Sequence, residues 1–403
     1  MSYEPDKAEL MLMAHSSRLI DYRPTRPSYG SYVHRPDTRD RGHRRWLLGV
    51  VVVALSLILA GCGSDLPQSS LNPKSAEALQ IDQLWRLVLY LAIAVFIVVE
   101  VALVVAIFRF RRRKDDDKPE PKQTHGNTTL EIVWSIIPAL ILVVITVPTM
   151  QTLFDLSSPA EGNVNRVNVT GHQWWWEFEY PDIVDAEGRP LTTANELHIP
   201  VGVTTELRMT SADVIHSFWV PPLAGKRDLV PGHETFIKIT PDPDRAGEEI
   251  PGQCAEFCWL SHADMRMLVF LETETDFDAW AQGQMQPAVV PADGPAASGF
   301  EIFTAICSTC HQAMVAAPDG GVSIIGVSLA PDLTHFGSRT TLGARVLDNT
   351  AEHLAQWLDN PSSVKPMAPE LNDFDTGRIL GMPDYGLDAD EIAELVALLE
   401  GWT

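Results

Sequence analysis

The twelve residues from Cys254 to Met265, CAEFCWLSHADM, bring together two cysteines, a glutamate, a histidine and a methionine. Thiolates select Cu(I), zinc or iron–sulfur clusters, imidazole suits copper and zinc, and a thioether strongly favours copper. Cys254 and Cys258 are close enough in sequence to face one point, with His262 and Met265 within reach. One further imidazole would complete a site for two metal ions, and His216 in DVIHSFWVPP is the natural candidate.

Two other chemistries fit part of this set of residues. A structural zinc site needs only two cysteines and two histidines, which would leave Met265 without a role. A redox dithiol would use the same cysteines, but its usual spacing is Cys-x-x-Cys, whereas three residues separate Cys254 from Cys258. The residue types therefore favour copper and leave these two alternatives open.

A second motif, Cys307-Ser-Thr-Cys310-His311, has the residues of a c-type haem attachment site. The cysteines would form thioether bonds to the haem vinyl groups, and His311 would be the proximal ligand of the iron. A methionine as the distal ligand would raise the haem potential into the range of an electron carrier. Met382 in LGMPDYGLDADEI is preferred because it lies shortly before the last predicted helix, and Met367 in VKPMAPELND is the alternative.

Short strands must hold the first motif. Between residues 164 and 280 apolar and polar residues alternate, and in GHQWWWEFEY one buried face would carry Trp174, Trp176, Phe178 and Tyr180. Prolines and glycines separate such runs at regular intervals. This pattern predicts an all-β sandwich or Greek-key barrel over residues 154–285.

Helices must hold the second motif. A linker rich in proline, alanine and glycine is expected at 286–299, and an all-α domain follows it over 300–403. The stretch APDLTHFGSR resembles the loop that carries a proline, here Pro331, toward the haem histidine in class I cytochromes c. The final stretch, LDADEIAELVALLEGW, has the spacing of a C-terminal helix that packs on the first helix.

Two apolar segments, at about 84–108 and 132–153, are each long enough to cross a hydrocarbon core of ~30 Å. The sequence between them begins RFRRRK, and a basic cluster directly after a span places the loop 109–130 in the cytoplasm. We therefore expect a transmembrane hairpin over 84–153, with the chain outside the cytoplasm from 154 onward. The length of the segments and their flanking charges argue against helices buried in a soluble core.

The N-terminal part carries the features of an export signal. RRWLLGVVVVALSLILAGC, which ends at Cys62, has a basic start, an apolar stretch and a small-residue end. Its last four residues resemble a bacterial lipobox, so 1–61 would be a leader and signal, Cys62 would be lipidated, and 62–83 would form an outer N-terminal segment. An uncleaved membrane anchor with an incidental cysteine is the alternative.

Composition excludes some classes of function. The net charge of −23 repels polyanions and argues against nucleic-acid binding, although it suits basic protein partners. Five cysteines, in two close pairs and one singleton, do not have the arrangement of a disulfide framework. Each has a local explanation in a metal site, a haem site or a lipidation site.

Residues from about 80 to 280 resemble subunit II of the haem–copper cytochrome c oxidases. The resemblance rests on HGNTTLEIVWSIIPALIL, GHQWWWEFEY, DVIHSFWVPPLAGKRDLVPG and CAEFCWLSHADM, in that order. It implies a cupredoxin-like fold and a dicopper centre, CuA, whose ligands would be Cys254 and Cys258 as bridges, His216 and His262 as caps, Met265, and the backbone carbonyl of Glu256. It also implies that the Glu256 side chain binds a magnesium ion shared with subunit I, and that electrons enter near Trp174.

The resemblance and the haem motif together imply a caa-type oxidase subunit in the plasma membrane of a bacterium. Electrons from a cytochrome c or a bc-type complex would pass through the haem and CuA to subunit I, which reduces oxygen and pumps protons. Oxidase subunits I and III would be partners. The linker would act as a tether that keeps the haem near Trp174, with an apolar haem edge rather than charge attraction making the contact.

Three other classes share parts of this pattern. A Sco-like copper chaperone has Cys-x3-Cys and a histidine on a membrane anchor, but it would show a thioredoxin pattern and a single span. A quinol oxidase subunit II lacks the copper ligands that are present here. A nitrous oxide reductase shares CuA but needs a large propeller for which the chain has no room.

Overall fold

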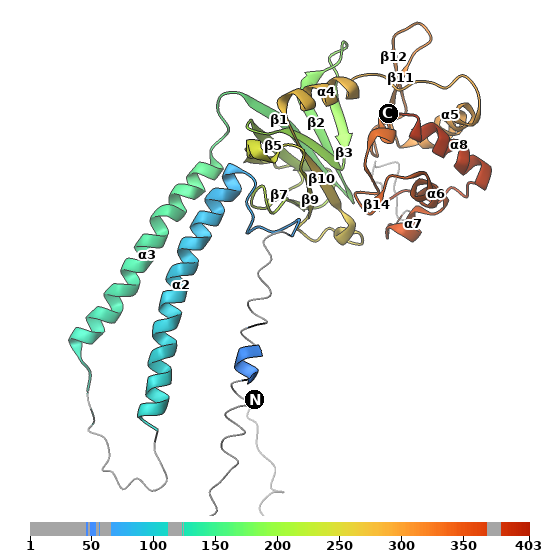
Figure 1. The fold of residues 1–403 in the computed structure, drawn as a ribbon. Coiled ribbons are helices and arrows are strands. Elements are labelled where there is room, and N and C mark those ends of the chain that lie inside the picture. Colours follow the sequence, from blue (N-terminus) through green and yellow to red (C-terminus); the bar gives the residue numbers. More distant parts are fainter. Residues whose placement is uncertain are drawn as a thin grey trace, which may run out of the picture. The chain divides into compact units, whose positions relative to one another are not determined.

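The computed structural model describes residues 66–111, 123, 125–368 and 380–403, together with 46, 49–53 and 56. The chain divides into two units, Met1–Gly63 and Ser64–Thr403. Cys62, the predicted lipidation residue, lies outside the described residues, as does most of the predicted leader. The second unit contains a helical hairpin, a β-sandwich and a C-terminal helical region (Figure 1).

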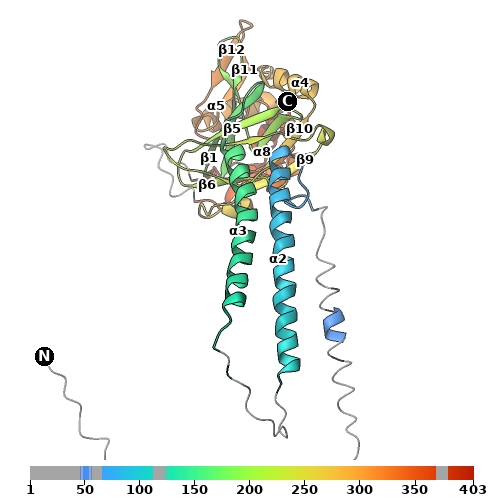
Figure 2. The same cartoon turned by 90° about the vertical axis from the view of Figure 1, so that its left-hand side faces the viewer.

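The hairpin consists of α2 (Ala76–Arg109) and α3 (Thr128–Ser157), which run side by side in both views (Figures 1 and 2). At 1.5 Å per residue α2 is about 51 Å long, which exceeds a hydrocarbon core of ~30 Å. Both helices are long and apolar enough to cross a membrane, and they contain the two predicted segments. Residues 112–122 and 124 of the predicted cytoplasmic loop lie outside the described residues.

The first turn of α2 is attached to the β-sandwich, which explains why this helix begins before the predicted apolar segment. Ser75 caps the helix by accepting a hydrogen bond from the backbone N–H of Ala78. The carboxylate of Glu77 accepts from the backbone N–H of Thr240 at 2.7 Å and from its hydroxyl at 3.0 Å. The polar start of α2 therefore connects the membrane hairpin directly to the domain that carries the metal motif.

The β-sandwich confirms the predicted fold, with two five-stranded sheets in the orders β3-β2-β1-β5-β8 and β4-β10-β9-β6-β7. The pairs β1–β5 and β4–β10 are parallel, and the remaining neighbours are antiparallel. The strands are β1 (Val164–His172), β2 (Trp175–Val184), β3 (Pro190–Ala194), β4 (Glu196–Pro200), β5 (Thr204–Ser211), β6 (His216–Trp219), β7 (Arg227–Leu229), β8 (Thr235–Ile239), β9 (Glu249–Cys254) and β10 (Arg266–Glu272). Helix α4 (Glu274–Gln284) follows the last strand.

The core of the sandwich follows the alternation seen in the sequence. Along β2 the predicted inward residues Trp176, Phe178 and Tyr180 are fully buried, whereas their neighbours are partly exposed. Trp174, which precedes the strand, is buried in the same core. A large apolar core of this kind fixes the strand register, because a shift by one residue would turn these rings toward water.

The helical region contains α5 (Pro295–Ala305), α6 (Ala351–Asp359), α7 (Pro361–Val364) and α8 (Ala389–Glu400). Helix α8 packs on α5 as predicted, and a Cβ at Gly299 of α5 would clash with the backbone of α8. Two strand pairs that the sequence did not suggest lie between the helices, namely β11 (Ala313–Ala316) with β12 (Val322–Ile325), and β13 (Thr341–Leu342) with β14 (Leu347–Asp348). Within the predicted linker, Ala288 pairs with Val315 of β11, and α5 already begins at Pro295.

Candidate metal centre and adjoining cavity

The loop from Cys254 to Met265 is held at both ends by antiparallel strands, because β9 ends at Cys254 and β10 begins at Arg266. Strand β6, which begins at His216, pairs with β9 on its other side. This arrangement brings an imidazole from another part of the sequence beside the cysteine loop, as the sequence analysis predicted.

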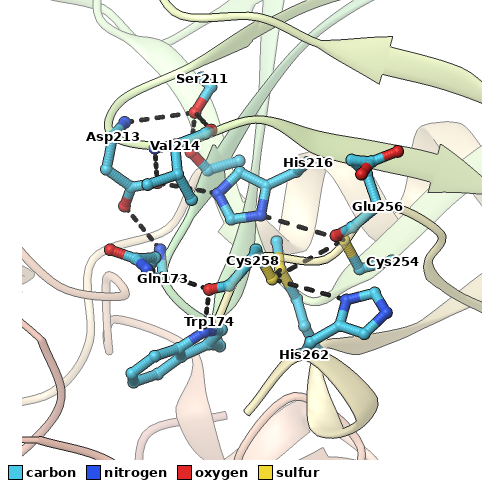
Figure 3. Close-up of polar contacts among 12 residues, drawn as sticks. Gln173, Trp174, Ser211, Asp213, Val214, His216, Cys254, Glu256, Cys258 and His262 are labelled. Carbon is cyan, nitrogen blue, oxygen red and sulfur yellow. Dashed lines mark hydrogen bonds and ion pairs between the residues drawn. The ribbon is translucent and has the colours of Figure 1, made fainter. Parts of the chain in front are cut away.

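The predicted ligand atoms of this loop converge on one buried point (Figure 3). The two sulfur atoms of Cys254 and Cys258 are 3.9 Å apart, well beyond the ~2.05 Å of a disulfide. Nδ1 of His216 lies 3.9 Å from Sγ of Cys254, and Nδ1 of His262 lies 3.7 Å from Sγ of Cys258.

Two further donors complete the cluster. Sδ of Met265 lies 3.9 Å from Sγ of Cys258, and the backbone oxygen of Glu256 lies 3.2 Å from Sγ of Cys254. The side chain of Glu256 is exposed, and in Figure 3 its carboxylate points away from the sulfur atoms. The loop therefore directs a soft donor set inward and one carboxylate outward.

The electrostatics of the cysteine pair suit a cation. The hydrogen bond with Cys258 lowers the pKa of Cys254, whereas the same interaction and burial raise the pKa of Cys258. Two thiolates this close repel each other, so the second proton leaves only when positive charge replaces it. Thiolates, imidazoles and a thioether form a donor set that suits copper.

Asp213, which the sequence analysis did not single out, orients the histidine. Its carboxylate lies 2.8 Å from Nε2 of His216, which leaves Nδ1 facing the sulfur atoms. Burial lowers the pKa of His216, but the hydrogen bonds and charges of Asp213 and Cys254 together outweigh it, so the pKa is raised. A carboxylate behind a ligating imidazole fixes the tautomer and ring orientation. The signal was present in DVIH, where the acid precedes the histidine by three residues.

Trp174 is hydrogen bonded to the cysteine loop. Its indole Nε1 donates to the backbone oxygen of Cys258 at 2.7 Å, and the side chain of Gln173 donates to the same oxygen at 3.0 Å. Trp174 is also buried and lines the large cavity of the helical region. One aromatic ring thus borders both predicted sites.

The residues of the second motif line a cavity of about 680 Å³. Cys307, Cys310 and His311 all border it, together with both candidate methionines. Nδ1 of His311 lies 2.7 Å from the backbone oxygen of Pro331, the proline that the sequence analysis singled out. Burial lowers the pKa of His311, so the imidazole is suited to act as a neutral ligand through Nε2.

The two methionines differ in their surroundings. Met382 packs against the apolar core of the helical region, whereas Met367 packs against the apolar core of the β-sandwich. Residues 369–379, which connect them, lie outside the described residues. The contacts associate Met382 with the haem motif and Met367 with the boundary between the two regions.

Lys365 also lies at this boundary, and the sequence analysis assigned it no role. It is buried and lines the cavity, and its Nζ donates to the backbone oxygen of Trp174 at 2.7 Å and to that of Gly343 at 3.0 Å. Burial lowers its pKa to about 7.

Three family models match the chain in order. They describe the transmembrane domain of cytochrome c oxidase subunit II at residues 67–152, its periplasmic domain at 165–271, and cytochrome c at 296–402. The chain is 33% identical to cytochrome c oxidase subunit 2 of Alkalihalophilus pseudofirmus, over 80% of this chain and 91% of the relative. It is 36% identical to cytochrome c oxidase subunit 2 of Bacillus sp. (strain PS3), over 81% of this chain and 92% of the relative.

Among solved structures, the chain is similar to the periplasmic domain of subunit II of cytochrome oxidase of Bradyrhizobium japonicum. The match has 25% sequence identity and a TM-score of 0.28, and it covers 32% of this chain and 95% of that chain.

Proposed function

The chain belongs to the cytochrome c oxidase subunit II family and carries a cytochrome c domain at its C-terminal end, and we propose that it holds a dicopper CuA centre and a covalent c-type haem on either side of Trp174. Its family makes it a membrane subunit of an oxidase complex that works with other oxidase subunits. The subunit II domain implies copper, and the cytochrome c domain implies haem.

The cysteine loop supplies the proposed copper ligands. Cys254 and Cys258 would bridge the two ions, and the remaining donors would be His216, His262, Met265 and the backbone oxygen of Glu256. When bound, such a centre accepts and releases one electron shared between two ions. The β-sandwich keeps the donors buried, and Asp213 holds the imidazole of His216 in one orientation.

The cavity supplies the proposed haem ligands. Cys307 and Cys310 would form the two thioether bonds, His311 would be the proximal ligand and Met382 the distal ligand. Pro331 fixes the His311 ring through its carbonyl oxygen, and the packing of Met382 against the helical core supports its assignment over Met367.

The placement of the protein in a complex completes the proposal. The two spans would lie in a bacterial plasma membrane with both cofactor domains on the extracytoplasmic side, anchored further by lipidation of Cys62. The outward carboxylate of Glu256 is suited to a magnesium site shared with subunit I. Subunit III would be a further partner, a cytochrome c or bc-type complex would be the donor, and oxygen chemistry would reside in subunit I.

A Sco-like copper chaperone is not favoured. Such a protein would have a thioredoxin pattern and one span, whereas the part of this chain that the structure describes has a two-sheet sandwich and two helices long enough to cross a membrane. The haem motif would also be left without a function in a chaperone.

The hydrogen bond from Trp174 to the carbonyl of Cys258, together with the position of Trp174 at the cavity, is the observation that carries the proposal. The test is stopped-flow reduction of the complete oxidase. In a Trp174→Leu variant haem reduction should stay fast while copper reduction becomes slow. An unchanged rate of copper reduction would show that Trp174 is not the entry point.

A further inference from the structure

Two buried charged side chains join the helical region to the β-sandwich, and each side contributes one of them. Glu196, at the start of β4, belongs to the sandwich, and Lys365, which follows α7, belongs to the helical region. Both are at least nine-tenths buried, which charged residues rarely are without hydrogen-bonding partners. Their partners lie on the opposite region.

Glu196 receives four hydrogen bonds from one short segment of the helical region. Its Oε1 accepts from the backbone N–H and the hydroxyl of Thr340 at 2.9 and 2.8 Å, and from the backbone N–H and the hydroxyl of Thr341 at 2.9 Å each. Successive backbone N–H groups form a concave site for an anion, and hydrogen bonds to a carboxylate are stronger than neutral ones.

Lys365 makes the reciprocal contact. Its Nζ bonds the carbonyl of Trp174, the same residue whose indole bonds the carbonyl of Cys258. Among the described residues no carboxylate lies within ion-pair distance of this ammonium group. A buried ammonium held by carbonyls alone is costly for stability. The position of Lys365 at Trp174 is therefore better explained by a role in aligning the two regions than by a contribution to the free energy of folding.

Other contacts cluster at the same boundary. The hydroxyl of Ser261, in the cysteine loop, bonds the carbonyl of Pro366, and the side chain of Met367 packs against the core of the sandwich. These polar contacts come in addition to the predicted tether and apolar contact. Part of the predicted linker 286–299 is held against the helical region, because Ala288 forms backbone hydrogen bonds in both directions with β11.

We propose that Glu196 and Lys365 are positioning residues that hold the haem domain in one docked pose, with its cavity against Trp174. This inference rests on the proposed function, because it assigns these residues to the transfer between haem and copper. Removal of either charge would leave buried partners unpaired and would increase the population of undocked molecules by about tenfold or more.

The test uses the full chain in the assembled oxidase, with Glu196→Gln and Lys365→Met as variants. Lys365→Arg, which keeps a buried cationic donor, should recover part of the effect. Glu301→Gln and Lys226→Met are matched controls, because they make the same changes at exposed positions. Thr340→Val is a milder variant that removes a single hydroxyl donor to Glu196.

Two readouts are combined. Amide hydrogen exchange should show protection of Thr340 and Thr341 reduced by about tenfold or more in the two variants and unchanged in the controls. Electron transfer from haem to copper should slow and become dependent on solvent viscosity, since redocking would limit the rate. Haem content, copper content and both potentials should stay those of the unaltered protein.

The proposal would be overturned if the two variants showed the same amide protection and the same rate of electron transfer from haem to copper as the control variants. Loss of haem or copper from the variants would overturn it as well, because the residues would then have a structural role. If the unaltered chain lacked either cofactor, the proposed function would fail, whereas the exchange data would still decide whether the two side chains hold the domains together.

Discussion

The cysteine cluster of the sandwich takes its donors from twelve adjoining residues and one neighbouring strand. The cavity of the helical region is lined by residues from Phe303 to Leu399 and by several residues of the sandwich, Trp174 among them. In the cluster each of the four side-chain donor contacts joins a cysteine sulfur to another donor atom within 4 Å, before any ion is considered. The cavity depends instead on packing between segments far apart in the sequence. A short loop between two strands can hold the donor atoms of a metal site in place, whereas a haem site requires the packing of a whole domain.

The largest expected effect follows from removing a bridging sulfur. Cys258→Ser should abolish binding of both copper ions, because a hydroxyl cannot replace a thiolate shared by two soft ions. Haem content should stay normal, since the cavity is built from other segments. Copper analysis of the purified chain, alongside the haem spectrum, checks both statements. Retention of both copper ions would contradict the bridging role.

The two methionines at the cavity offer a sharper comparison. Met382→Leu should lower the haem potential by tenths of a volt, within the ~0.8 V range that axial ligands span. Met367→Leu should leave the potential close to its original value, because Met367 packs against the core of the sandwich. Redox titration of the haem in both variants provides the measurement. A large shift in Met367→Leu alone would reverse the ligand assignment.

A smaller effect is expected at Gly171 of β1. A Cβ there would lie 2.8 Å from Cδ2 of His216, so Gly171→Ala should displace the imidazole. We expect a loss of about 1–3 kcal/mol in the free energy of unfolding, together with an altered copper spectrum. Gly283→Ala is the control, because nothing lies within 4 Å of its Cβ. Equal stability and an unchanged spectrum in both variants would show that the ring tolerates the added methyl group.

Much of the fold follows from local patterns in the sequence. The alternation in GHQWWWEFEY gives the buried face of β2, and the spacing of the C-terminal stretch gives the contact of α8 with α5. The cysteine cluster could also be predicted from the sequence, because most of its candidate ligands are close together in the chain and soft donors rarely gather by chance. The structure brings all of these residues together, and their roles as copper ligands stay predictions.

The contacts between the domains could not be read from the sequence. Glu196 and Thr340 are 144 residues apart, and Lys365 is 191 residues from Trp174. A single glutamate or lysine in a soluble-looking segment carries no pattern that distinguishes a surface charge from a buried one. The overall acidity of both regions favoured an apolar contact, and it gave no indication of the two individual charges with backbone partners that the structure adds. The short pairs β11–β12 and β13–β14 were missed because each strand has four residues or fewer.

The central claim is that one chain carries both a dicopper centre and a covalent haem. The most direct measurement is the metal and haem content of the purified full-length chain, with haem assayed after denaturation and organic extraction. We predict two copper ions and one haem per chain, with the haem remaining attached to the protein. One zinc ion in place of copper, or a haem that is extracted freely, would contradict the account.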